Sequence, residues 1–151
     1  MASLLEQEWQ HRSSGLPLKR PYEALVLASV VEKETGAAQD RPLIASVFVN
    51  RLKAGIPLQS DPTVIYGMGP NFDGNLRKRD LQTDTPFNSY LRKGLPPTPI
   101  ALPGRAALQA VLNPPASSYL YFVARGDGSS AFSRTLDEHN RAVSKYQKGG
   151  K

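Results

Sequence analysis

Two glutamates, Glu32 and Glu34, stand one lysine apart at the end of an apolar stretch of the chain. On a helix of 3.6 residues per turn, Leu27 and Val30 lie roughly 20° and 40° from Glu34, and Glu32 lies on the opposite side. Glu34 is therefore expected within an apolar face and Glu32 on the solvent side. Burial against apolar groups raises the pKa of a carboxyl group, which suits Glu34 to act as a general acid.

Spacing alone leaves another interpretation of Glu34 open. A glutamate near a helix end is commonly solvated or paired with an arginine, because charged side chains are seldom buried without a partner. Further motifs in the sequence are needed to decide between a catalytic acid and a surface carboxylate.

Composition excludes several other kinds of chemistry. The chain has no cysteine, which removes thiol catalysis, disulfides and cysteine-bound zinc. Its two histidines, His11 and His139, are far apart in the sequence and the carboxylates are not grouped. We therefore expect no metal and no cofactor. His139 is expected to be a helix histidine with satisfied ring nitrogens.

The net charge of +6 raises the possibility of a nucleic-acid-binding domain. The basic residues are scattered, however, and no run of five like charges occurs. No basic stripe interleaved with aromatic residues or known nucleic-acid motif is present. We expect no nucleic-acid partner. No apolar run reaches the roughly 20 residues that a membrane helix needs.

The helix that carries Glu34 is predicted over residues 22–35. Pro21 suits its first turn, and Gly36 is expected to be its C-cap. Asp40 is expected to cap the next helix, over residues 41–54.

The predicted fold class is α+β, with helices packed around a small antiparallel sheet in one domain over residues 1–151. Residues 1–20 are expected to form a helix, over residues 2–11, and a connector. Gly126 and Gly128 favour a β-hairpin in the C-terminal half. The remaining predicted elements are short helices at 62–66, within 79–92, at 104–112 and at 136–147, and strands at 119–124 and 131–134.

Five motifs together resemble the YceG-like family of endolytic murein transglycosylases. The likeness runs from about Pro21 to about Gln147, with the motifs in family order. The motifs are A-S-V-V-E-K-E-T at 28–35, V-F-V-N-R-L at 47–52, L-Q-S-D-P-T-V-I-Y-G at 58–67, G-L-P-P-T-P-I at 94–100 and Y-F-V-A at 121–124.

The resemblance implies an enzyme that cuts peptidoglycan. Members of the family cleave the β-1,4 bond between MurNAc and GlcNAc within a glycan strand and leave a 1,6-anhydro-MurNAc end. The family's catalytic glutamate is the second of the E-K-E pair, which falls on Glu34. One carboxyl group then serves as acid and as base, because the substrate's own C6 hydroxyl takes the place of water.

Asp61 is open to two interpretations. As a second carboxylate it would permit hydrolysis, which uses two carboxyl groups; as the residue before 62–66 it would cap that helix. Other polar and aromatic side chains in or near the motifs are expected to bind the sugar units, although each alone is more often structural. These predicted substrate-binding residues are Gln59, Asp61, Tyr66, Asn88, Tyr90, Asn50 and Ser130.

Two positions depart from the family pattern. Phe87 stands where the family usually has tyrosine, and Ser130 stands where it usually has histidine, two residues before Phe132. The second departure leaves room for a non-catalytic peptidoglycan-binding module, although Glu34 is intact.

The resemblance also implies features outside this chain. It places an inner-membrane anchor and a small LysM-like domain before the catalytic domain, neither of which is in these 151 residues. The full-length protein is accordingly expected at the periplasmic face of the inner membrane, and this segment is expected to be soluble. The expected partners are peptidoglycan strands and proteins of cell-wall synthesis.

Overall fold

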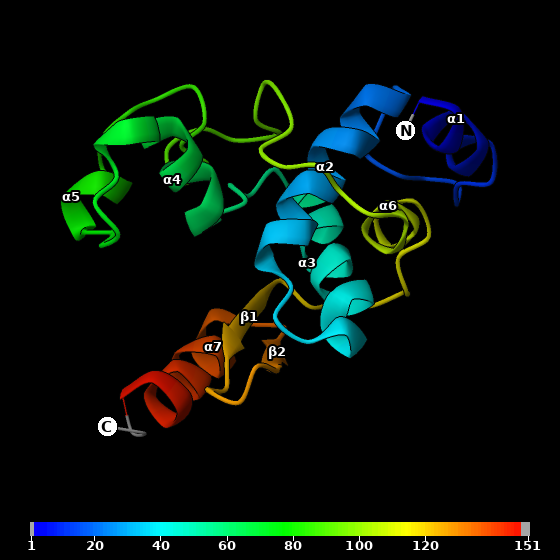
Figure 1. Cartoon of the computed structure of the whole chain (residues 1–151). Coiled ribbons are helices and arrows are strands. Elements are labelled where there is room, and N and C mark those ends of the chain that lie inside the picture. The colour runs from blue at the N-terminus through cyan, green and yellow to red at the C-terminus, as the bar shows by residue number, and fades with distance from the viewer. Residues whose placement is uncertain (1, 149–151) are drawn as a thin grey trace.

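A computed structural model of the protein describes residues 2–148 and has a mixed α+β fold (Figure 1). The predicted fold class is confirmed, and each predicted helix and strand is present with ends shifted by a few residues. In chain order the α-helices and strands are α1 (Ala2–Gln10), α2 (Pro21–Glu34), α3 (Arg41–Ala54), α4 (Asp61–Met68), α5 (Lys78–Leu81), α6 (Arg105–Leu112), β1 (Tyr121–Ala124), β2 (Ser130–Ser133) and α7 (Leu136–Val143). Short 3-10 helices lie at Ala38–Asp40 and Gly69–Asn71, and a π-helical turn, Ser144–Lys148, continues α7.

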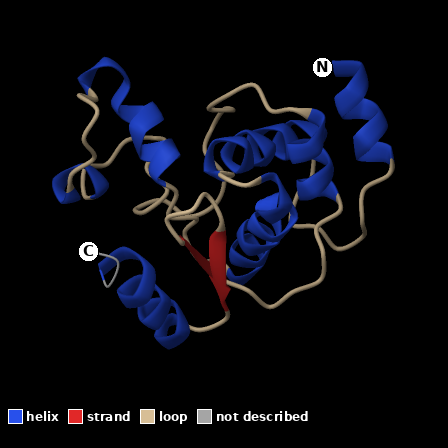
Figure 2. Cartoon of the chain, turned by 60° about the horizontal axis from the view of Figure 1, so that its bottom comes forward, coloured by secondary structure: helices blue, strands red, loops and turns tan. Residues whose placement is uncertain are grey.

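The main core lies where α2, α3 and α6, labelled in Figure 1, pack together. Figure 2 shows that helices, in blue, make up most of the fold and that the strands, in red, form one small part of it. Leu27, Phe48 and Leu108, one from each helix, are at most 1% exposed. Burying a side chain of this size contributes about 1.5–3 kcal/mol. Glu32 lies outside the core but is not a bare surface residue, because its Oε1 accepts the N–H of Gly104, at 2.8 Å, just before α6 begins. This hydrogen bond connects α2, the helix that carries Glu34, to the start of α6.

The two strands form an antiparallel hairpin in which Phe122 lies opposite Phe132. Phe122 packs edge-on against Phe48 of α3, with ring centres 5.7 Å apart. Tyr121, on the other face of the hairpin, stacks on His139 of α7 at 4.9 Å. The sheet therefore lies between α3 and α7.

Strand β1 begins two residues later than predicted. The side-chain amide of Asn50, on α3, donates to the carbonyls of Ser117 (3.0 Å) and Tyr119 (2.9 Å). This segment is thus bonded to α3 before it joins the sheet. A local sequence pattern cannot predict a hydrogen bond between a side chain and backbone groups that lie far away in the sequence.

Two expected caps have different roles in the structure. Asp40 precedes α3 but makes no capping hydrogen bond, and its Oδ2 accepts the N–H of Ser130 at 2.8 Å. The C-cap of α2 is Thr35, in an extended conformation, rather than Gly36. A Cβ on Gly36 would lie 2.6 Å from the carbonyl oxygen of Gly128. Gly36 is therefore needed for close approach of the hairpin turn.

Helices α4 and α5 lie to one side of α2, in green in Figure 1. Helix α4 is longer than predicted, since it begins at Asp61 and ends at Met68. Its Tyr66 ring packs against Phe87, with ring centres 4.8 Å apart. Phe87 thus keeps an aromatic contact at the position where tyrosine was expected. Within residues 2–148, no helix has the length and apolar character required to span a membrane.

Candidate active site

A cavity of about 450 Å³ opens where the end of α2 meets α3, α4, the hairpin and α7. It combines an apolar wall with several ionisable and amide side chains. Its lining residues are Glu34, Val47, Arg51, Leu58, Gln59, Asp61, Tyr90, Tyr121, Phe122, Leu136 and His139.

Glu34 is the last residue of α2, and its carboxyl group is partly buried in this cavity beside Val47, Leu58 and Phe122. Burial raises the pKa of Glu34 from its ordinary value of 4.5 to about 8, and the negative charge of Asp61 adds to this shift. No hydrogen bond from the described residues stabilises the charged form. Glu34 therefore holds a proton at neutral pH, which a general acid must do.

Asp61 lies in the same cavity, at the first position of α4. The helix is preceded by Ser60 and has no side-chain capping bond. The Asp61 carboxylate instead accepts the hydroxyl hydrogen of Tyr90 at 2.5 Å. Asp61 therefore does not cap α4, and its carboxylate lines the cavity that also holds Glu34.

The segments that carry Asp61 and Tyr90 are fastened together by backbone and hydroxyl groups. Gln59 N donates to the carbonyl of Ser89 at 3.1 Å, and Ser60 N donates to Ser89 Oγ at 2.9 Å. Ser60 and Ser89 are both buried. These bonds hold Asp61 next to Tyr90 although the two residues are 29 positions apart.

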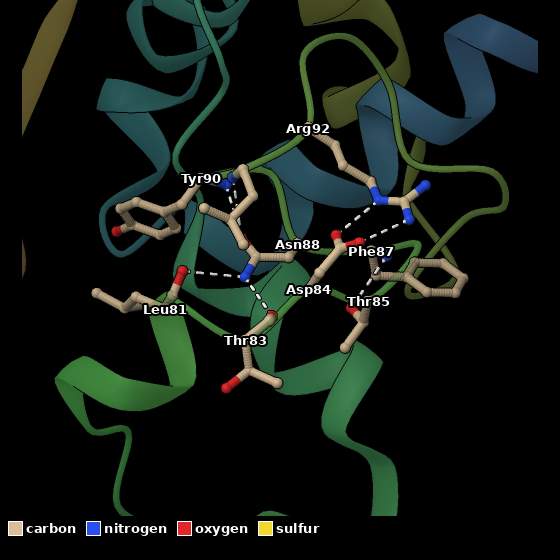
Figure 3. A network of polar contacts seen from close by, with 9 residues as sticks. Leu81, Thr83, Asp84, Thr85, Phe87, Asn88, Tyr90 and Arg92 are labelled. Atoms are coloured by element: carbon tan, nitrogen blue, oxygen red, sulfur yellow. Dashed lines mark hydrogen bonds and ion pairs between the residues drawn. The ribbon is translucent and has the colours of Figure 1, made fainter.

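Asn88 does not line the cavity but shapes the loop that carries Tyr90 (Figure 3). Its side chain is fully buried and donates to the carbonyls of Leu81 (3.0 Å) and Thr83 (2.8 Å). Its Oδ1 accepts the N–H of Tyr90 at 2.9 Å. With these bonds made, Asn88 acts as a support for Tyr90 and has no exposed group to offer a sugar.

Gln59 has a left-handed backbone, with φ of 56°. This conformation is uncommon and strained for a residue other than glycine, and such residues cluster at functional sites. It turns the Gln59 side chain toward the cavity, where Oε1 accepts from Arg51 Nη1 at 3.4 Å.

Arg51 and Tyr121 also line the cavity, and neither is among the substrate-binding residues predicted from the sequence. The Arg51 side chain is 5% exposed and donates to the carbonyls of Leu120 (2.7 Å) and Pro57 (2.6 Å). Its guanidinium lies 4.9 Å from the Tyr121 ring centre. One signal was available: Arg51 follows Val47 by four residues, so both lie on one face of α3.

His139 was expected to have satisfied ring nitrogens, and this expectation is wrong. Its Nδ1 is buried and has no hydrogen-bond partner among the described residues. The ring lines the cavity and stacks on Tyr121. Burial, together with the nearby charge of Arg51, lowers the pKa of His139.

Three other predicted substrate-binding residues lie outside the Glu34 cavity. Tyr66 is 47% exposed on α4, and the Asn50 amide bonds the backbone before β1. Ser130 lines a separate hollow of about 620 Å³, next to Asp40. The structure thus brings Glu34, Gln59, Asp61 and Tyr90 together and separates the rest.

The cavity is suited to proton transfer. It holds one carboxyl group that is neutral at pH 7 and a second carboxylate with a hydrogen-bond donor. Over residues 2–148, no group of three or more histidine, aspartate or glutamate side chains is arranged to hold a metal ion.

Comparison with known proteins gives the family. The model of the YceG-like family matches residues 1–145. An endolytic murein transglycosylase of Bacillus subtilis is 47% identical over 83% of this chain, and one of Streptococcus pneumoniae is 36% identical over 82%. These matches cover 34% and 23% of the two relatives, so the chain spans about a third or less of their length.

A solved structure agrees with this assignment. The crystal structure of a YceG-like protein from Listeria monocytogenes superimposes with a TM-score of 0.73 at 43% identity, covering 80% of this chain and 38% of that one. The sequence match and the shared fold lead to one conclusion. The chain belongs to the YceG-like family.

Proposed function

We propose that this chain is the catalytic domain of a lytic transglycosylase that cleaves peptidoglycan within its glycan strands. The observation that carries the proposal is the Glu34 carboxyl group, whose pKa of about 8 keeps it protonated in a cavity of polar side chains. The relatives named as endolytic murein transglycosylases support the substrate class.

In the proposed reaction Glu34 acts twice. As an acid it gives its proton to the glycosidic oxygen between MurNAc and GlcNAc, and the bond from that oxygen to C1 breaks. The resulting carboxylate then takes the proton of the MurNAc C6 hydroxyl, whose oxygen attacks C1 and closes the 1,6-anhydro ring. No water is consumed, and Glu34 ends protonated as it began. The substrate's N-acetyl group assists at C1.

The remaining cavity residues are proposed to bind and orient the sugars. The Gln59 amide suits sugar hydroxyls and acetamido groups, and the Tyr90 ring offers an aromatic surface. Tyr66, exposed on α4, is suited to stack on a sugar farther along the strand.

A second reaction has one observation in its favour. Asp61 lies in the same cavity as Glu34, close enough for its charge to raise the pKa of Glu34. Two carboxyl groups around one glycosidic bond are the requirement for hydrolysis, in which the second serves as nucleophile or as base for water. Hydrolysis would leave a reducing MurNAc end in place of the anhydro end.

Mass analysis of products distinguishes these reactions. Uncrosslinked glycan strands are digested with the wild-type chain, with Glu34→Gln and with Glu32→Gln as the matched control. We expect anhydro ends from the wild type and from Glu32→Gln, and no product from Glu34→Gln. Reducing ends would establish the hydrolase. Strand binding without any product would establish a binding module, and product from Glu34→Gln would refute the assignment of Glu34.

The family resemblance extends the proposal to the whole protein. We propose that a membrane anchor and a LysM-like domain precede this domain, and that the protein acts on the periplasmic side of the inner membrane with proteins of cell-wall synthesis. Cell fractionation of the full-length protein, followed by cross-linking in intact cells, tests this part.

A further inference from the structure

His139 has an unusual environment for a helix histidine. It lies on α7, about a hundred residues after Glu34 in the sequence, yet both side chains line one cavity. The Nδ1 atom is buried without a hydrogen-bond partner among the described residues. Buried polar atoms are nearly always bonded, so an exception at a cavity wall points to a partner that arrives with a ligand.

The position of His139 is firmly set. Helix α7 begins with a reciprocal capping box between Thr135 and Glu138, one residue before His139. The imidazole stacks on Tyr121 with ring centres 4.9 Å apart and an angle of 21° between the planes. Tyr121 also faces the Arg51 guanidinium at 4.9 Å. The ring is thus held in place on a rigid wall of the cavity, as a ligand-binding group should be.

The chemistry of this ring fits a neutral polar ligand. A neutral imidazole offers one N–H donor and one nitrogen acceptor. Burial, and then the nearby charge of Arg51, lower the pKa of His139 and so disfavour a positive charge on the ring. A sugar hydroxyl or an acetamido group can donate to the acceptor nitrogen or accept from the ring N–H.

We propose that His139 is a further substrate-binding residue of the Glu34 cavity, and that a nitrogen of its imidazole hydrogen-bonds a hydroxyl or acetamido group of the glycan. This inference rests on the proposed function, because the ligand is the same strand. The alternative is that the ring only packs against Tyr121 and docks α7 to the hairpin.

Two substitutions separate hydrogen bonding from packing. His139→Phe keeps an aromatic ring on Tyr121 but removes both nitrogens, and His139→Gln keeps a polar group but removes the ring. His11→Phe, on an exposed histidine outside the cavity, is the matched control. We expect His139→Phe to raise KM for uncrosslinked glycan strands about tenfold, as the loss of one good hydrogen bond predicts, with a smaller change in kcat.

His139→Gln is expected to recover part of this loss, and His11→Phe to behave as the wild type. A wild-type KM for His139→Phe, with a folded protein, would assign the ring to packing alone and overturn the proposal.

A second measurement needs no substitution of His139. The chain contains two histidines, so ring NMR signals can be assigned with His11→Phe. Glycan oligomers are titrated into the Glu34→Gln protein, which we expect to bind them without turnover. We expect the His139 ring signals to shift with saturation while those of His11 stay in place; saturable binding that leaves His139 unshifted would refute the proposal.

The two proposals fail in distinguishable ways. Product from Glu34→Gln would remove the proposed function. If Glu34→Gln makes no product and the His139 variants keep the wild-type KM, the proposed function stands and only the role of His139 is removed.

Discussion

The Tyr90 hydroxyl donates a 2.5 Å hydrogen bond to Asp61, and the Asp61 charge in turn raises the pKa of Glu34. Burial, followed by the bond to Asp61, raises the pKa of Tyr90 itself, so this phenol remains a donor throughout the working pH range. Tyr90 therefore fixes the position of a carboxylate that helps to keep the proposed acid protonated.

A double-mutant cycle on this pair should reveal coupling. Tyr90→Phe and Asp61→Ala each remove one side of the bond, and we expect the two changes in unfolding free energy to be non-additive by about 1 kcal/mol. The value is modest because Asp61 is exposed to solvent. Urea unfolding of the four proteins measures it. Tyr66→Phe combined with Asp61→Ala is the control and should be additive. If the effects of Tyr90→Phe and Asp61→Ala on the unfolding free energy are also additive, their hydrogen bond does not contribute to stability.

Activity should fall as the pH rises through about 8, where Glu34 loses its proton. Asp61→Asn removes a neighbouring negative charge, so the midpoint of this alkaline limb should move to lower pH. It should stay above 4.5, because burial is the larger cause of the shift and is unchanged. Measurement of kcat/KM from pH 5 to 10 for both proteins tests this. An alkaline limb that stays in place or moves upward in Asp61→Asn would contradict the electrostatic explanation.

Glu34 should also make stability depend on pH. Below pH 4.5 its carboxyl group is protonated in both states; between pH 4.5 and about 8 the unfolded chain releases the proton while the native state keeps it. The free energy of unfolding therefore falls across this window, by up to about 5 kcal/mol at 1.36 kcal/mol per pKa unit. Glu34→Gln lacks this cost, so it should be the more stable protein at pH 8.5 and nearly equal to the wild type at pH 4.

Urea unfolding at the two pH values measures the difference. Glu32→Gln serves as the control, because an amide oxygen can still accept from Gly104 N. A gain for Glu34→Gln that is the same at both pH values would mean that the carboxyl group is not buried as described.

Substitution of Gln59 should affect activity more than stability. Glycine adopts the positive φ of this position without strain, but it also gives the unfolded chain more freedom. We therefore expect Gln59→Gly to change the unfolding free energy by less than about 1 kcal/mol while lowering kcat/KM about tenfold through the lost amide. Gln59→Asn keeps an amide and tolerates this backbone, so it should lie between the two. Full activity in Gln59→Gly would leave the strained conformation without a functional reason.

The parts of the site that the sequence predicted are local. Helical periodicity separated Glu34 from Glu32 because a helix sets the direction of each side chain over a few residues. Turn and cap residues located the helices and the hairpin for the same reason. The motif at 58–67 pointed to Gln59 and Asp61 only through the family resemblance, because the residues just before α4 follow no regular pattern.

The parts that escaped prediction depend on contacts between distant segments. His139 and Tyr121 enter the cavity only because the hairpin packs against α3 and α7 packs against the hairpin. Asn50 was predicted to bind sugar, but its amide bonds the backbone of Ser117, 67 positions away. Asn88 was predicted likewise, but its amide is used within its own loop, by the carbonyls of Leu81 and Thr83. Asp40 likewise bonds Ser130, 90 positions away, where a helix cap was expected.

The last prediction concerns the close contact between the end of α2 and the hairpin turn. Gly36→Ala would place a Cβ 2.6 Å from the carbonyl oxygen of Gly128, and a backbone atom can yield only if the turn moves. We expect a loss of about 1–3 kcal/mol in unfolding free energy, as for other overpacked sites. Activity should fall too, because Phe122 of the same hairpin lines the Glu34 cavity.

Gly104→Ala is the matched control for this substitution, since a Cβ there meets only Glu32 Oε1, at an ordinary contact distance of 3.4 Å. Urea unfolding and the glycan-strand assay measure both variants. If Gly36→Ala retained the stability and activity of Gly104→Ala, the hairpin turn would not need its close approach to α2. The geometry of the cavity would then have to be maintained by α3 and α7 alone, through the contacts of Phe122 with Phe48 and of Tyr121 with His139.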